Sequence, residues 1–197
     1  GNDFIVPDST SAIDLTGPAS VEGVDVSQND FAPVDANTDT YTAVDFGPSA
    51  NLGTDTSYVV SANTIEKVGG GQTGIAINDV NDANTVVEIT NNNLVNVTAG
   101  LAIGSNGQGA LTLTAVDSVD ISDNTIVGDA DGSTASGINV DATGEGASTS
   151  ITRNSISDLN DPASVALTLA DGGTAATVEE NEFDTNGQHI DFASANN

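Results

Sequence analysis

The pattern of apolar and polar positions repeats along this chain. Each repeat contains an apolar residue, two further residues, an asparagine, one residue and a second apolar residue. The asparagines follow one another at intervals of 27 to 34 residues. They are Asn29, Asn63, Asn92, Asn124, Asn154 and Asn181. Six occurrences at a nearly constant interval indicate one structural unit that recurs along the chain.

A second pattern falls between the asparagine motifs. It consists of a small residue, an apolar residue, any residue and another apolar residue, as in the Gly-Ile-Ala-Ile of residues 74–77. The other occurrences, with a histidine in place of the small residue in the last, cover residues 12–15, 43–46, 100–103, 137–140, 164–167 and 189–192. Alternation with a period of two predicts short strands between turns, and no segment has a sustained helical period.

Strands this short cannot each bury an apolar face alone, so equivalent strands of successive repeats are expected to stack. Parallel pairing at about 4.8 Å between strands satisfies the backbone and buries one apolar column. The recurring asparagine suits a turn, and stacked asparagines are expected to form an internal amide ladder. The prediction is an all-β fold: a single domain over residues 1–197, forming a single-stranded parallel β-helix of about six coils.

Together, the two patterns resemble the repeats of right-handed parallel β-helices of the pectate-lyase-like superfamily, in the form found in many secreted and surface proteins. The resemblance covers about residues 10 to 193. It implies a right-handed solenoid in an extracellular or cell-surface location. It does not imply one activity, because this scaffold serves lyases, hydrolases, adhesins and phage spikes alike.

The charge of the chain is strongly one-sided. Its 29 acidic residues face one lysine and one arginine, which gives a net charge of −27. Such a surface excludes nucleic-acid or anionic-membrane binding through a basic patch, and no apolar run reaches the roughly 18 residues of a membrane-spanning helix. Carboxylate repulsion destabilises the compact state unless salt screens it. The composition resembles that of proteins from salt-loving microbes; a seawater or calcium-rich extracellular setting is the alternative.

One arginine is the candidate for catalysis. Lyases of the superfamily use an Arg or Lys near calcium-binding carboxylates, and Arg153 has Asp123 and Glu180 at the same motif position one coil away on either side. An outward ion pair is the interpretation we prefer. Lys67 lies three coils away, too far to cooperate at about 4.8 Å per coil. The Gly-His-Gly and Arg-Ile-Lys of the pectinase branch are missing, so His189 is expected to be a surface residue of the last coil.

Calcium is the candidate cofactor. Residues 35–39 read Asp-Ala-Asn-Thr-Asp, the oxygen-ligand spacing of the first half of a calcium loop, but the glycine and closing glutamate of such a loop are missing. Residues 129–133 contain a similar short cluster. Asp-rich turns are also ordinary turn chemistry, so both interpretations stay open. The candidate ligands are Asp35, Asn37, Asp39, Asp129 and Asp131.

Apolar, strand-like sequence continues almost to both ends of the chain, and no capping helix is evident. An uncapped β-helix exposes unpaired backbone and core side chains, so the ends are expected to pair head to tail with another copy or to continue into a longer solenoid. The candidate end residues are Phe4, Ile5, Ile13, Leu15, Phe183, Ile190 and Phe192.

These observations favour a non-catalytic structural role, as a subunit of a filament or surface assembly or as a segment of a long adhesin. The alternative is a carbohydrate-binding or carbohydrate-active module whose ligand is a polysaccharide. The ends discriminate between them, because an enzyme closes its ends and builds a groove whereas an assembly subunit leaves them open. A single glycosylation sequon at Asn96 is weak evidence for either role.

Overall fold

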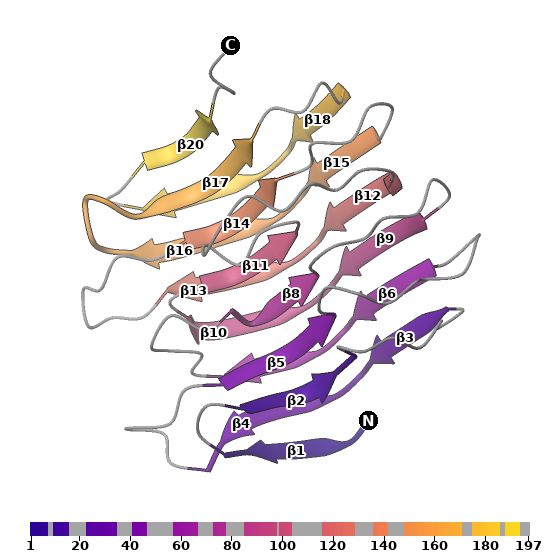
Figure 1. Cartoon of the computed structure of the whole chain (residues 1–197). Helices are drawn as coiled ribbons and strands as arrows, with labels where there is room; N and C mark the ends of the chain where they lie inside the picture. Colours follow the sequence, from indigo (N-terminus) through magenta and orange to yellow (C-terminus); the bar gives the residue numbers. More distant parts are fainter. Residues whose placement is uncertain are drawn as a thin grey trace.

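A computed structural model describes residues 1–7, 10–15, 23–34, 41–46, 57–66, 73–77, 85–97, 99–103, 116–128, 136–141, 148–170, 175–185 and 188–193. Over these ranges the chain forms twenty strands and no helix. The strands stack into a parallel β-solenoid, shown in Figure 1. This confirms the predicted fold class.

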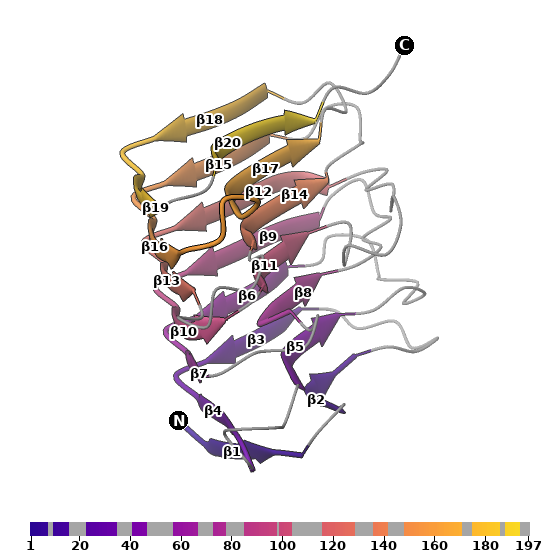
Figure 2. The ribbon, with the colours of Figure 1, turned by 90° about the vertical axis from the view of Figure 1, so that its left-hand side faces the viewer.

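Three parallel sheets make up the solenoid. The first contains β1 (Asp3–Val6), β4 (Asp30–Pro33), β7 (Thr64–Glu66), β10 (Asn93–Val97), β13 (Thr125–Gly128), β16 (Ser155–Leu159) and β19 (Glu182–Thr185). The second contains β2 (Thr10–Asp14), β5 (Tyr41–Phe46), β8 (Ile75–Ile77), β11 (Ala99–Ile103), β14 (Ser136–Asp141), β17 (Val165–Ala170) and β20 (Gln188–Ala193). The third has six strands: β3 (Val24–Ser27), β6 (Ser57–Ser61), β9 (Thr85–Thr90), β12 (Val116–Ser122), β15 (Ser148–Thr152) and β18 (Ala175–Glu179). The chain visits the sheets in turn, and neighbours within a sheet are three elements apart (Figure 2).

In the first and third sheets, alternate side chains of a strand fill the interior. In β6, for example, Tyr58 and Val60 are buried while Ser57 is exposed. Parallel register places like positions above one another, so the interior consists of apolar columns. The column of the first sheet contains Phe31, Ile65, Leu94, Ile126 and Ile156, and that of the third contains Val26, Val60, Ile89, Ile121 and Ile151. Each buried side chain contributes roughly 1.5–3 kcal/mol, so this repeated burial is the main source of stability.

In β11 the small residue of the second pattern, Gly100, avoids a backbone clash. A Cβ atom on Gly100 would lie only 2.6 Å from the carbonyl oxygen of Gly137 in the next coil. In β17 this position belongs to Ala166, because Leu167 pairs with Ile138. The pattern at residues 164–167 was therefore placed two residues too early, since an alternation of period two fits both registers.

Thr149 has a buried hydroxyl with no hydrogen-bond partner in the described part of the structure. Its side chain is 3% exposed and shares a core column with Val87 and Val119. By contrast, the buried Tyr41 hydroxyl lies 2.6 Å from the carbonyl oxygen of Glu66, to which it donates. A buried hydroxyl without a partner costs roughly 1–3 kcal/mol.

The substitution Thr149→Val should therefore raise the free energy of unfolding by about 1 kcal/mol, because valine has nearly the same shape and no polar atom to satisfy. Thr125→Val is the control, since Thr125 is exposed on β13, and it should change stability by less than about 0.5 kcal/mol. Urea unfolding followed by circular dichroism measures both variants. Equal shifts in the two would contradict this account of Thr149.

Candidate functional site

Two consecutive residues turn the chain from the third sheet to the first. The first of them adopts a left-handed backbone conformation, with φ between 54° and 58°. Its side chain is exposed, whereas the asparagine that follows lies inside. This conformation costs a residue with a Cβ roughly 1–2 kcal/mol, so the contacts of the asparagine must offset it. The left-handed residues are Gln28, Ala62, Asn91, Asp123, Arg153 and Glu180.

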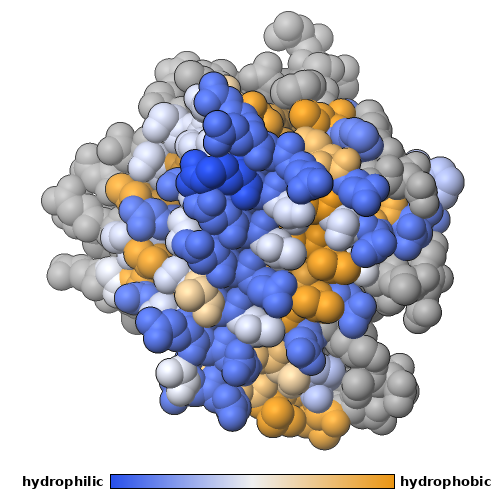
Figure 3. Space-filling model, turned by 180° about the vertical axis from the view of Figure 1, so that it is seen from behind, coloured by the Kyte–Doolittle hydropathy of each residue, from blue (hydrophilic) through white to orange (hydrophobic). Residues whose placement is uncertain are grey.

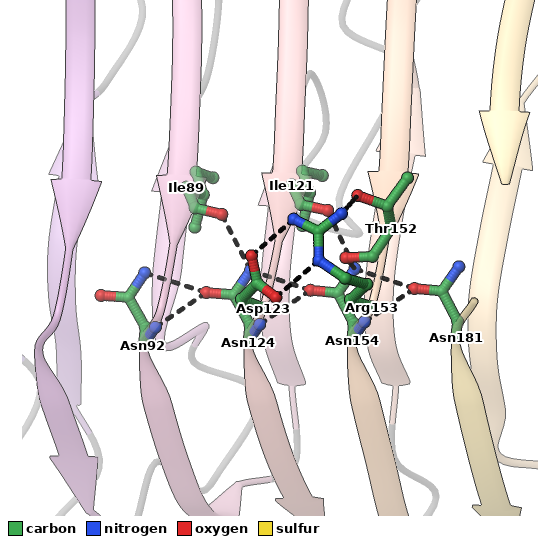
Figure 4. A network of polar contacts seen from close by, with 9 residues as sticks. All are labelled: Ile89, Asn92, Ile121, Asp123, Asn124, Thr152, Arg153, Asn154 and Asn181. Atoms are coloured by element: carbon green, nitrogen blue, oxygen red, sulfur yellow. Dashed lines mark hydrogen bonds and ion pairs between the residues drawn. The ribbon is translucent and has the colours of Figure 1, made fainter. Parts of the chain in front are cut away.

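The asparagines form a continuous hydrogen-bonded ladder (Figure 4). Asn124 Oδ1 accepts from the backbone N–H and from Nδ2 of Asn92, both at 3.0 Å. Asn124 Nδ2 donates to Asn154 Oδ1 at 2.9 Å and to the carbonyl oxygen of Ile89 at 2.8 Å. The same side-chain contacts, between 2.9 and 3.2 Å, join Asn29, Asn63, Asn92, Asn124, Asn154 and Asn181 in sequence. The structure thus brings all six asparagines of the sequence motif into one column.

Asn2 adds a rung that the sequence pattern missed. Its backbone N–H and its Nδ2 both donate to Asn29 Oδ1 at 3.1 Å. The signal was present in part, because Asn2 stands 27 residues before Asn29 and is followed after one residue by the apolar Phe4. Only the second half of the motif could be recognised there.

The ladder has a direction. Each rung from Asn2 to Asn154 donates its backbone N–H and Nδ2 to the Oδ1 of its C-terminal neighbour. Asn181, the last rung among the described residues, accepts from both nitrogens of Asn154 at 2.9 Å. The first rung therefore has its Oδ1 toward one end of the stack, and the last described rung has its backbone N–H toward the other. The Nδ2 of Asn181 donates to the carbonyl oxygens of Ile151 at 2.8 Å and Glu179 at 3.1 Å.

Arg153 forms a surface ion pair with Asp123 on the neighbouring coil. Its Nε donates to Oδ1 at 2.8 Å and its Nη2 to Oδ2 at 2.7 Å, while the two side chains are 50% and 38% exposed. The hydrogen bond lowers the pKa of Asp123. Asp123, and more weakly Glu180 and Asp120, raise the pKa of Arg153. Because the pKa of Asp123 is lowered on folding, the pair stabilises the fold above the ordinary aspartate pKa and loses this contribution as the pH falls.

The calcium candidates Asp35, Asn37, Asp39, Asp129 and Asp131 lie outside the described residues, as does Lys67. Within the described ranges, no three His, Asp or Glu side chains are grouped as a metal site would require. Nor does a helix in this part of the chain have the length and apolar character to cross a membrane. Asn96 lies at an irregularity of β10 with φ 58°, and the Thr98 of its sequon is not among the described residues. His189 is exposed, with its ring centroid 6.2 Å from that of Phe183.

The candidate end residues fall into two groups. Phe4, Ile13, Leu15, Phe183 and Ile190 are half-buried and pack against the core. The Phe4 ring stacks on Phe31 at a centroid distance of 4.9 Å. Ile5 was wrongly assigned to the end face: it is 64% exposed on the outer surface, because alternation along β1 turns its neighbours inward. For Phe192 the structure describes the backbone, which pairs with Leu169.

The outer surface of the corner is polar. Figure 3 shows a hydrophilic band along the back of the molecule, bordered by apolar patches. The exposed side chains of the corner include Gln28, Asn91 and the Asp123–Arg153 pair. A band of this kind keeps the outer surface hydrated, whereas the apolar columns end at the two ends of the stack.

Together these features define a parallel β-solenoid with a directional asparagine ladder at one corner. Comparison with protein-family models, with curated proteins and with solved structures finds no match for this chain. Function must therefore be inferred from the chain's own geometry.

Proposed function

We propose that this protein is an extracellular structural solenoid that associates with copies of itself end to end, as a filament or surface assembly. The observation that carries the proposal is the pair of open edges. The strands β1, β2 and β3 form the edges at one end, and β18, β19 and β20 at the other, with no further described strand or helix beyond them (Figure 2). Unpaired backbone on a strand edge is a template for another strand. A contact between two different ends propagates unless its rotation closes a ring.

The apolar ends of the columns support the same proposal. Phe4 and Ile13 at one end, and Phe183 and Ile190 at the other, pack against the core but are only half-buried. A second copy stacked on either end would remove the remaining apolar surface from water, which is favourable at roughly 25 cal/mol per Å². We also propose that the chain is related to the secreted and surface right-handed β-helices of the pectate-lyase-like superfamily. The repeat pattern of the sequence supports this relationship.

A carbohydrate-active role is less well supported. Its candidate residue, Arg153, donates two hydrogen bonds to Asp123, which is the arrangement of a surface ion pair. Cations, calcium among them, enter the proposal as counter-ions that screen the acidic copies from one another. Side-by-side packing of two such surfaces is opposed by repulsion, so the assembly should be slender.

Sedimentation velocity and negative-stain electron microscopy of the purified chain test this proposal. The mean mass should increase with protein concentration and with NaCl, and the particles should be fibres one solenoid wide. A protein that stays monomeric at high concentration and high salt would refute the proposed function.

A further inference from the structure

We infer that the asparagine ladder sets the orientation of the end-to-end contact, with Asn181 of one copy donating to Asn2 of a second copy. This inference depends on the proposed self-association and names the residues that would join the copies. The occupant of each open end is then a second copy of this chain, in one orientation only.

The first support is the complementarity of the two ends. All six steps of the ladder use the same donors and the same acceptor, in the same direction. Asn2 is exposed and directs its two nitrogens to Asn29, so its Oδ1 is the ladder acceptor at the open edge. Asn181 directs its Oδ1 to Asn154, and its Nδ2 donates to the carbonyl oxygens of Ile151 at 2.8 Å and Glu179 at 3.1 Å. The Nδ2 of Asn154 donates in the same way to the carbonyl oxygens of Ile121 and Thr152 and also contacts Asn181 Oδ1, so the Nδ2 of Asn181 can contact a further Oδ1 at the opposite edge. Two like ends would place acceptor against acceptor or donor against donor.

The backbone at the same corner provides a second contact. The residue after each asparagine donates its N–H back to the carbonyl oxygen of the preceding rung, as Asp30 does to Asn2 at 2.9 Å and Glu182 does to Asn154 at 2.8 Å. In the proposed junction, the N–H of Asp3 would donate in the same way to the carbonyl oxygen of Asn181. The junction thus repeats three of the corner hydrogen bonds of an interior step.

The register of the first two sheets agrees with this contact. Phe4 and Phe183 occupy the same column, since Phe4 pairs with Phe31 and Phe183 pairs with Ile156. Placing Asn2 next to Asn181 therefore puts the Phe4 ring on the Phe183 ring. This repeats the stacking already seen between Phe4 and Phe31.

The same alignment holds in the second sheet. Ile13 pairs with Val44, and Ile190 pairs with Leu167 of the same column, so the junction continues this column as Ile190 followed by Ile13.

Charge repulsion opposes the contact, because Glu182 and Asp3 would be in-register neighbours across the junction. The association should therefore strengthen as salt screens this pair.

Two substitutions of equal charge, Asn181→Asp and Asn2→Asp, test the direction of the ladder. Asn181→Asp keeps an acceptor for Asn154 but places a carboxylate, in place of a donor, opposite Asn2 of the second copy. It also removes the Nδ2 donation to the carbonyl oxygens of Ile151 and Glu179 within its own copy, so its stability is measured together with its association. It should weaken association at least about tenfold. Asn2→Asp still presents an acceptor to the second copy, so its association constant should stay within about threefold of the parent value. Sedimentation velocity at high salt measures both, after circular dichroism has shown that each variant is folded.

Asn2→Ala is the second variant. Asn2 is exposed, so this substitution should leave the chain folded. It loses the same donation to Asn29 as Asn2→Asp does and also loses the acceptor, so it should associate as weakly as Asn181→Asp. Mixing the Asn181→Asp variant with the parent protein gives a further test. A variant chain can add its intact acceptor end to a parent fibre, but its other end cannot bind the next copy. Small amounts of the variant should therefore shorten the fibres. Equal effects of Asn2→Asp and Asn181→Asp, or unaffected association in all variants, would overturn the inference. A monomeric parent would instead refute the proposed function.

Discussion

Dialysis of this protein into low-salt buffer with a chelator should unfold it. With 29 acidic residues against two basic ones, nearly every surface charge repels its neighbours. At about 0.1 M salt the screening length is about 10 Å, longer than the spacing of about 4.8 Å between adjacent strands. Stability should therefore keep rising toward about 1 M salt, where the screening length is about 3 Å. Thermal melts followed by circular dichroism across this range test the expectation, and an unchanged melting temperature would contradict it.

The register places some acids directly beside one another on adjacent strands. Glu88 and Asp120 are in-register neighbours on adjacent strands, and two unit charges about 4 Å apart repel by about 1 kcal/mol even in water. Glu88→Gln should raise the urea midpoint, more in low salt than in high salt. The control is Asp184→Asn, which removes the same charge from a residue that pairs with Ser157. If the two variants behave alike, net charge and not register determines the repulsion.

Loss of one interior rung should be costly. Asn124→Ala should lower the free energy of unfolding by about 3 kcal/mol, because it removes the acceptor of the buried Asn92 backbone N–H, one of the two acceptors of Asn92 Nδ2, and the donor to the carbonyl oxygen of Ile89. The side chain of Asn124 is 1% exposed, so water cannot replace these contacts without opening the fold.

Asn2→Ala provides the matched comparison, since Asn2 is exposed and its side chain makes one ladder contact, to Asn29. It should cost less than about 1 kcal/mol. Urea unfolding of both variants in high salt gives the two free energies. Similar costs at Asn124 and Asn2 would mean that burial does not determine the strength of a rung.

The repeated parts of this fold were predictable from the sequence because stacking imposes the same requirement on every coil. A ladder asparagine is satisfied by another asparagine one coil away, so the same residue recurs at each step. Where the repetition is incomplete, prediction failed. Asn2 showed only half of its motif, and an alternation of period two left the register around Leu167 two residues in doubt.

Side-chain direction and contact were harder to predict than position in the repeat. Ile5 was assigned to the end face because it is apolar, although its place in the alternation turns it outward. The column of Arg153 followed from the motif, but its two-nitrogen contact with Asp123 depends on side-chain geometry. The calcium candidates lie outside the described residues, so their prediction is not tested.

Among the described strands, the third sheet has one fewer than the other two, and this difference has a mechanical consequence. In a fibre joined through the ladder, the first and second sheets run on from copy to copy, but the third stops at β18 and resumes at β3 of the next copy. Each junction is then joined through two sheets, whereas adjacent coils within a copy are joined through three. Such a fibre is a row of stiff segments with evenly spaced weak points, and under tension it breaks between copies before any copy unravels.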